Sequence, residues 1–362
     1  MDIASIDSFL AINDKYNENT RFFSAKEAPF SVHGVYFDEK DGQYVRMPGE
    51  VSEKVSHGVF KLSKQTSGGR LRFRTDSPFI ALRCIAPVFR PMSHMSILGM
   101  FGFSLYVDGR SFGRVMPTPD AVITPASEGI VFGGSCNIPA FAGEGMHDIE
   151  IFFPLYGGVK VLDVGLKEGA QTEEAVPYKY KKPIVFYGSS VTQGACASRP
   201  GCDFVNTLSR LLDADVLNLG FSGNGNAEAP MIEYLSGLDA AAFVFDYNYY
   251  ASKPDRVLPP HLSIYEALRE KNPNTPIIMI DKPGSDYDPI GYEKRSEFIK
   301  NTYETALSRG DTLVAMVDAY DLFGDENRDG CLVDNNHPND FGFYKMAKNL
   351  EPVLKNLLEK CK

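Results

Sequence analysis

Two short segments, far apart in the chain, carry side chains that could together catalyse acyl transfer. Ser190 lies in YGSSVTQG, directly after an apolar run, where flanking glycines permit a tight turn into a helix. Asp334 and His337 lie three residues apart in DNNHP. A serine hydroxyl needs a neighbouring base, and an imidazole needs a carboxylate that fixes its tautomer. The residue types predict a Ser–His–Asp triad, although each segment alone is more typical of an ordinary polar turn.

Two further segments, which lie between Ser190 and Asp334 in the sequence, carry hydrogen-bond donors. NLGFSGNGNAE (218–228) is rich in glycine, and DYNYY (246–250) contains Asn248. A tetrahedral intermediate of acyl transfer needs donors aimed at its developing oxyanion, and a glycine backbone N–H together with an asparagine amide supplies them. Asp246 is an equally prominent residue of the second segment. We therefore expect these two segments to form an oxyanion hole.

The second half of the chain has the pattern that would position these four segments. Helical periodicity alternates with short runs that are apolar on both faces, which predicts a doubly wound α/β domain with a parallel sheet. The polar segments follow the first, second, third and fifth strands, and such folds bind ligands at the carboxyl ends of their strands. The last helix is expected to kink or restart at Pro352. The predicted strands are 183–188, 215–220, 241–247, 276–281 and 312–318.

The first half of the chain has a different pattern. Short β-type runs, bounded by Gly, Pro, Asp and Ser, fill it, and several alternate between apolar and charged side chains as in RLRFRTD. This alternation predicts an all-β sandwich of half-buried antiparallel sheets. A charged stretch near 171–182 predicts the boundary between the halves. We divide the chain into an N-terminal segment (1–29), a β-sandwich domain (30–177) and a catalytic α/β domain (178–362).

With these motifs in place, the sequence resembles the SGNH (GDSL-like) hydrolase family, whose four blocks contribute Ser, Gly, Asn and His in that order. GSSVTQG is similar to the first block, which implies that Ser190 is the nucleophile and that its own N–H is one oxyanion donor. FSGNG is similar to the second block, with Gly223 the better match and Gly220 the alternative. DYN is similar to the third block and implies Asn248 as the remaining donor. DNNHP implies Asp334 as the orienting carboxylate and His337 as the general base.

The sequence departs from the family pattern at three positions. Ser189 stands where the family usually has an acidic residue before the nucleophile. Asp246 stands where a glycine usually lies two residues before the asparagine, and Tyr249 follows that asparagine in place of an acid. These departures leave open whether Asn248 or Asp246 serves the third block.

The resemblance extends to a two-domain subgroup with an N-terminal, jelly-roll-like β-sandwich, through FRTDSPFIALR, LYVDG and HDIEIFFPLYGGVKVLDVGL. Its members are similar to carbohydrate acetylesterases. The resemblance implies a serine esterase that removes O-acetyl groups from a plant polysaccharide or oligosaccharide through an acetyl-enzyme. Two alternatives are a lipase or thioesterase, and a non-catalytic glycan-binding protein on a hydrolase scaffold. Candidate substrate contacts are Arg199, Tyr249 and Tyr250, with loop anchoring as the competing role of Arg199.

Composition excludes several other classes. The chain has 362 residues, a net charge of −10 and no run of about 18 apolar residues, so we expect neither nucleic-acid binding nor a membrane span. Its six cysteines contain no CxxC, and its histidines lack partners at metal-ligand spacing, so no metal and no cofactor is expected. No export signal is recognisable, which fits a cytoplasmic protein or an exported one whose signal has been removed. The sequence carries no indication of oligomeric state.

Overall fold

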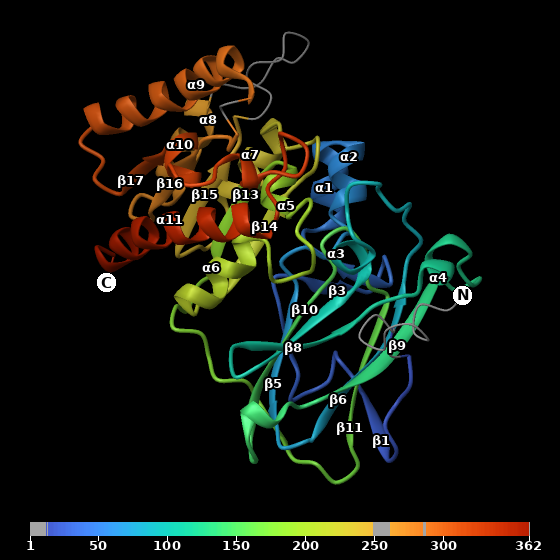
Figure 1. Ribbon diagram of the computed structural model, residues 1–362. Coiled ribbons are helices and arrows are strands. Elements are labelled where there is room, and N and C mark those ends of the chain that lie inside the picture. Colours follow the sequence, from blue (N-terminus) through green and yellow to red (C-terminus); the bar gives the residue numbers. More distant parts are fainter. Residues whose placement is uncertain (1–11, 13, 249–260, 285–286, 362) are drawn as a thin grey trace. The chain divides into compact units, whose positions relative to one another are not determined.

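The structure is a computed structural model, and it describes residues 12, 14–248, 261–284 and 287–361. The chain forms two compact units, an all-β unit and an α/β unit, as the sequence predicts (Figure 1). The first unit comprises the chain up to Val45, Lys64–Pro177 and Ser198–Gly201. The second comprises Arg46–Ser63, Tyr178–Ala197 and Cys202–Lys362. The domain boundaries at 29/30 and 177/178 stay predictions.

The first unit contains two antiparallel sheets. The alternating strand RLRFRT buries Leu71 and Phe73 completely and leaves Arg72 and Arg74 partly exposed. The rings of Phe103 and Phe132, one from each sheet, lie 6.0 Å apart, so apolar faces of both sheets contribute to one core. One sheet has the order β1 (Thr20–Ser24), β11 (Val161–Lys167), β6 (Phe79–Ala86), β9 (Ile130–Asn137). The other has the order β12 (Thr172–Glu173), β5 (Arg70–Thr75), β10 (His147–Phe152), β7 (Phe103–Val107), β8 (Arg110–Val115), with β2 (Ser31–His33) also on β5.

Short elements connect these strands. Ser96 and Thr118 cap two short helices by accepting a backbone N–H with their side-chain oxygens. The elements are β3 (Tyr36–Asp38), β4 (Gln43–Val45), α3 (Ile97–Phe101), α4 (Pro119–Ile123) and the 3₁₀ turn η3 (Ala140–Ala142).

The second unit contains a five-stranded parallel sheet with the order β14-β13-β15-β16-β17. The chain begins at β13, adds β14 on one side of it, and then adds β15, β16 and β17 on the other side. Such a change of side is a topological switch point, which opens a crevice at the carboxyl ends of the strands. All five strands fall within the predicted runs: β13 (Ile184–Gly188), β14 (Val216–Gly220), β15 (Ala242–Asp246), β16 (Ile277–Ile280) and β17 (Val314–Val317).

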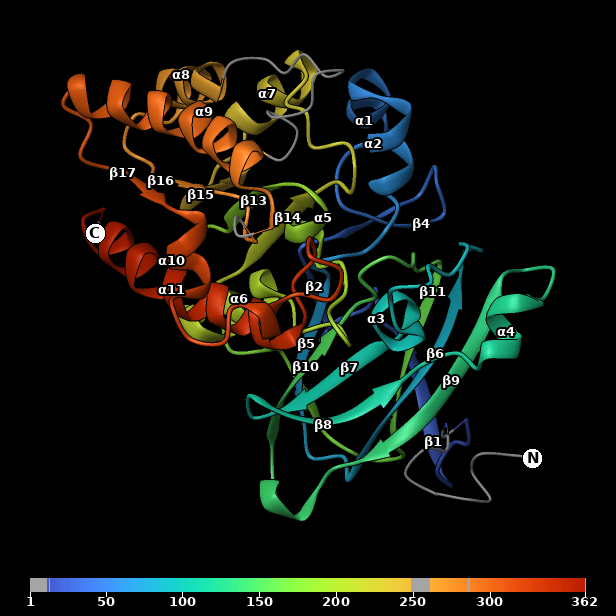
Figure 2. The ribbon, with the colours of Figure 1, turned by 45° about the horizontal axis from the view of Figure 1, so that its top comes forward.

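Helices cover both faces of this sheet (Figure 2). One face packs α7 (Ala229–Ser236), α8 (His261–Lys271) and α9 (Pro289–Ser308). On the other, α6 (Phe204–Leu212) contacts α11 (Asp340–Glu359) through the stacked rings of Phe204 and Phe343. Helix α11 runs through Pro352 as one element, because packing against α6 holds it together despite the missing N–H. The remaining elements are α5 (Ser190–Gln193), α10 (Ala319–Phe323) and the 3₁₀ turn η5 (Asp329–Cys331).

Two helices from the first half of the sequence pack into the second unit. They are α1 (Gly49–Val55) and α2 (His57–Leu62), and α1 contacts α7. Met47, Val55 and Val59 are buried in the same core as Phe221 of the α/β unit.

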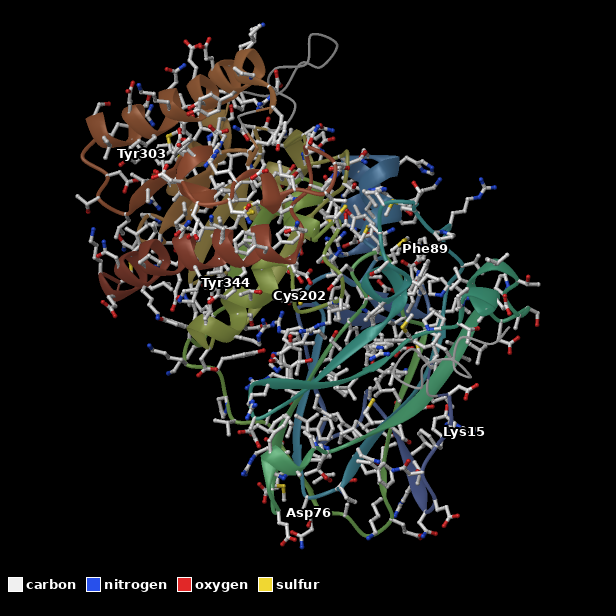
Figure 3. The ribbon with its side chains drawn as sticks, viewed as in Figure 1. Lys15, Asp76, Phe89, Cys202, Tyr303 and Tyr344 are labelled. Atoms are coloured by element: carbon white, nitrogen blue, oxygen red, sulfur yellow. The ribbon has the colours of Figure 1, made fainter. Side chains whose placement is uncertain are left out.

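Of the residues labelled in Figure 3, Tyr303 of α9 packs against this core, whereas Tyr344 of α11 is exposed. Across the described residues, no helix has both the length and the hydropathy of a membrane span.

Candidate active site

The turn after β13 presents Ser190 at the start of a helix. Ser189 is the N-cap of α5, and its side-chain oxygen accepts the Val191 N–H at 3.1 Å. The preceding residue has to be glycine, because a Cβ at Gly188 would lie 2.7 Å from the Cβ of Asp246 on the neighbouring strand. Helix α5 ends after one turn at Gly194, whose φ of +97° suits glycine. This short, tightly packed turn holds Ser190 in one place, with only 5% of its surface exposed.

Ser190, His337 and Asp334 form a continuous chain of hydrogen bonds. Oγ of Ser190 lies 2.9 Å from Nε2 of His337, and Nδ1 of His337 lies 2.9 Å from Oδ2 of Asp334. The backbone N–H of His337 also donates to Oδ1 of Asp334 at 2.8 Å. With Nδ1–H facing a carboxylate, Nε2 is the acceptor that faces the serine hydroxyl.

The loop before α11 fixes the positions of Asp334 and His337. The Val333 N–H donates to the His337 carbonyl at 2.9 Å, and Asn339 caps α11 by accepting the Gly342 N–H at 3.0 Å. Burial alone would raise the pKa of Asp334, but the hydrogen bonds from His337 outweigh it, so the pKa lies below its ordinary value. Asp334 is therefore an anion at neutral pH, and it can stabilise an imidazolium at His337.

Asp246 and Asn248, at the end of β15, have different partners. Oδ2 of Asp246 accepts hydrogen bonds from Ser189 Oγ at 2.7 Å and Thr192 Oγ1 at 2.9 Å. Burial raises the pKa of Asp246 to about 6, and the two hydroxyl donors act in the opposite direction. Asn248 is completely buried, and its Nδ2 donates to Oδ1 of Asp281. Asp246 thus accepts from the turn that carries Ser190, whereas the Asn248 side chain is a donor, as its predicted oxyanion role requires.

The two glycines considered for the second block also differ. The N–H of Gly220 donates to Oδ1 of Asn218 at 2.9 Å, and a Cβ at Gly220 would lie 2.3 Å from the Gln193 nitrogen. Gly220 therefore lets β14 approach the turn that carries Ser190 closely, and its N–H is already engaged by Asn218. Gly223 lies in the following turn with a φ of +73°, a conformation that favours glycine.

The predicted substrate contacts are only partly described. Arg199 donates to the Tyr106 hydroxyl at 2.8 Å, within the first unit. This bond fits the anchoring role, and a substrate contact of Arg199 stays a prediction. Tyr249 and Tyr250 lie outside the described residues.

One group of side chains has the atoms to hold a metal ion. Ligand atoms of Cys196, Asp334 and His337 lie within 4.8 Å of one another. Both ring nitrogens of His337 already face Asp334 and Ser190, and burial raises the pKa of Cys196 to about 12, which disfavours the thiolate. A metal here would compete with the hydrogen-bonded chain, so these residues fit proton transfer better than metal binding.

No sequence pattern predicted a role for three residues that this geometry brings into the site. Ser189 and Thr192 hold the turn that carries Ser190 to Asp246, and Asp281 contacts Asn248. The available signal was position: Asp281 directly follows β16, just as Asp246 ends β15.

Comparison with known proteins agrees with the motifs. Residues 181–355 match the GDSL-like lipase/acylhydrolase family, and residues 20–172 match the family described as the N-terminus of SGNH-hydrolase-type esterases. A search of curated proteins finds no significant match.

Solved structures share the two-unit architecture. A putative GDSL-like lipase from Bacteroides ovatus is 26% identical, with a TM-score of 0.78 over 94% of this chain and 98% of its own. A salicylyl-acyltransferase from a tetracycline biosynthetic pathway is 21% identical, with a TM-score of 0.71 over 94% and 98%. A family two carbohydrate esterase from Clostridium thermocellum, in complex with cellohexaose, is 14% identical, with a TM-score of 0.59 over 91% and 99%. Residues 20–172 match the N-terminal domain of SGNH-hydrolase-type esterases. Residues 181–355 belong to the GDSL-like lipase/acylhydrolase family of SGNH hydrolases, and the chain is a carboxylic ester hydrolase.

Proposed function

We propose that the protein is a serine esterase that removes O-acetyl groups from carbohydrate, with Ser190, His337 and Asp334 as its catalytic triad. The observation that carries this proposal is the continuous hydrogen-bonded chain from Ser190 Oγ through the imidazole to the Asp334 carboxylate. This is the arrangement that makes a serine hydroxyl nucleophilic at neutral pH.

In the first half-reaction, Ser190 Oγ attacks the acetyl carbonyl carbon while His337 Nε2 takes the hydroxyl proton. Asp334 stabilises the resulting imidazolium through Nδ1–H. The carbonyl oxygen becomes an oxyanion that accepts hydrogen bonds from the Ser190 N–H, the Gly223 N–H and the Asn248 amide. Collapse breaks the bond to the sugar oxygen, which takes the proton from His337 and leaves as an alcohol.

In the second half-reaction, water replaces the sugar. His337 removes a proton from the water, whose oxygen attacks the acetyl-enzyme, and the same donors stabilise the second oxyanion. Collapse releases acetic acid and returns the proton to Ser190 Oγ. Both steps are acyl transfers in which no oxidation state changes, so the reaction needs no redox partner.

Two observations support a sugar ester as the substrate. The chain shares its two-unit fold with a carbohydrate esterase whose structure contains cellohexaose, and its motifs resemble carbohydrate acetylesterases. Ser190 is 5% exposed and Asn248 is completely buried, and such low exposure favours a small acyl group. A lipase or thioesterase would need room beside the reacting atoms for a longer acyl chain.

The test is ester turnover with acyl groups of different length. Acetate release is measured from acetylated xylo-oligosaccharides and p-nitrophenyl acetate, beside p-nitrophenyl octanoate, with Ser190→Ala as the control. We expect turnover of the acetyl esters that depends on Ser190. Preferential octanoate turnover would favour a lipase or thioesterase. A folded wild-type protein without turnover of any ester would contradict the hydrolase proposal and favour glycan binding.

A further inference from the structure

Asp281 is a buried carboxylate beside the proposed oxyanion hole, and the mechanism above does not use it. It directly follows β16, which pairs with β15, and β15 leads into Asn248. Both side chains are completely buried. Nδ2 of Asn248 donates to Oδ1 of Asp281, and the Lys282 backbone N–H donates to the same oxygen at 2.7 Å. The Asp281 N–H donates to the Val317 carbonyl at 3.0 Å, so the backbone on both sides of this carboxylate is fixed.

This contact selects the orientation of the Asn248 amide, with Nδ2 rather than Oδ1 facing Asp281. The oxygen and nitrogen of an asparagine amide have nearly the same shape, so only hydrogen-bond partners select between its two orientations. Rotating the amide by 180° would place Oδ1 of Asn248 against the Asp281 carboxylate, where two acceptors would repel. Oδ1 of Asn248 has no hydrogen-bond partner among the described residues, so nothing described on that side selects the orientation.

The amide nitrogen has two hydrogens, and Asp281 accepts one of them. The second hydrogen is the one that a substrate oxyanion can accept. We propose that Asp281 is a positioning residue of the oxyanion hole, which holds Nδ2 of Asn248 in the orientation that stabilises the tetrahedral intermediate. This inference rests on the proposed role of Asn248.

A double-mutant cycle tests whether Asp281 acts through Asn248. Because burial raises the pKa of Asp281 to about 6, turnover of p-nitrophenyl acetate is measured at pH 8, where this carboxylate is ionised. Asn248→Ala should lower kcat by roughly 10²–10³-fold, the usual loss for one oxyanion donor. Asp281→Ala should lower kcat by at least about 10-fold and change KM by less than about 3-fold, because the oxyanion that the Asn248 amide stabilises forms only in the transition state. The double variant should match Asn248→Ala within about 2-fold.

Two further variants separate positioning from stability. Asp281→Asn keeps a carbonyl oxygen that both the Lys282 N–H and the Asn248 amide can use, so it should recover most of the kcat lost in Asp281→Ala. Asp203 is also a completely buried carboxylate, and it caps α6. Asp203→Ala should lower the melting temperature. Its effect on kcat should be small and the same in the wild-type and Asn248→Ala backgrounds. If Asp281→Ala does not fold, Asp281→Ser enters the cycle, because its hydroxyl can accept the Lys282 N–H but is too short for Asn248.

Two results would overturn the inference. One is an equal fold-loss in kcat from Asp281→Ala in the wild-type and Asn248→Ala backgrounds. The other is an unchanged kcat with only a lower melting temperature. Either result, together with turnover that Ser190→Ala abolishes, leaves the proposed function intact. If Ser190→Ala is as active as the wild-type protein, the proposed function fails, and the positioning role fails with it.

Discussion

The Ser189 hydroxyl donates a hydrogen bond of 2.7 Å to Oδ2 of Asp246, at the end of the strand beside β13. These are two of the positions at which the sequence departs from the SGNH pattern. The acid expected before the nucleophile is a serine, and the glycine expected on the next strand is an acid. Gly188 pairs directly with Asp246 in the sheet, so the carboxylate reaches the turn that carries Ser190 from the neighbouring strand. The two departures are therefore coupled, because one supplies the donor and the other the acceptor.

The charge on Asp246 should make stability depend on pH. Burial raises its pKa from 3.8 to about 6, so between these values the folded protein holds a proton that the unfolded chain has released. Stability contributed by this group is complete below pH 4 and is lost as the pH rises towards 6 and above. Asp246→Asn cannot ionise at this position. As the pH rises from 4 to 7.5, its free energy of unfolding should therefore increase by on the order of 1–3 kcal/mol relative to that of the wild-type protein.

Urea unfolding at several pH values measures this difference. Asp281 and the other carboxylates titrate in both proteins, so their contribution cancels in the comparison. Asp213→Asn is the matched control, because Asp213 is exposed in the same unit and its left-handed backbone tolerates asparagine. Parallel stability curves for Asp246→Asn and the wild-type protein would show that Asp246 does not bind a proton on folding.

Neighbouring serines should have opposite phenotypes. Ser190→Ala should remove nearly all ester turnover and leave the melting temperature almost unchanged, since it deletes the proposed nucleophile. Ser189→Ala loses the cap to Val191 and one of the donors to Asp246, so the free energy of unfolding should fall by about 1–2 kcal/mol. Its kcat should fall only a few-fold. Initial rates and thermal melts of both variants decide this, and an inactive Ser189→Ala beside an active Ser190→Ala would reverse the assignment.

Asp334 should be essential for rate and dispensable for substrate binding. Asp334→Asn keeps the shape of the side chain but offers no negative charge to the imidazolium, and it can hold the ring in the wrong tautomer. The expected loss in kcat is roughly 10³–10⁴-fold with little change in KM. Steady-state kinetics on p-nitrophenyl acetate measure both constants, and His337→Ala sets the baseline. A kcat within about 3-fold of the wild-type value would assign the orienting role to another group.

Much of this architecture follows from local patterns. Runs that are apolar on both faces locate all five parallel strands, because a sheet covered by helices on both sides demands them. The same runs place Ser190 and Asn248 just after two of those strands, at the carboxyl edge where such folds bind ligands, and their catalytic roles stay predictions. The contact between Asp281 and Asn248 could not be predicted, because it depends on the register of β16 against β15, and apolar runs do not encode register when both faces are buried.

The unbroken α11 shows a different limit. Pro352 removes a helical hydrogen bond, which local reasoning weighs heavily, but Leu350 and Leu354 on either side are completely buried. Tertiary packing outweighs the local cost there. Helices α1 and α2 show the same limit, since nothing in their short sequences indicates that they pack into the core of the α/β unit.

Those two helices lead to a last prediction about the α/β core. Val59 of α2 is completely buried in the core that contains Phe221, whereas Lys61 on the same helix is exposed. Val59→Asp would place an unpaired carboxylate in an apolar site, so it should lower the melting temperature of the α/β unit sharply or prevent soluble expression. Ser190-dependent turnover should be lost at the same temperature. Lys61→Asp makes a larger change in charge at the surface and should leave both nearly unchanged. Equal melting temperatures for the two variants would show that the α/β core is complete without α2.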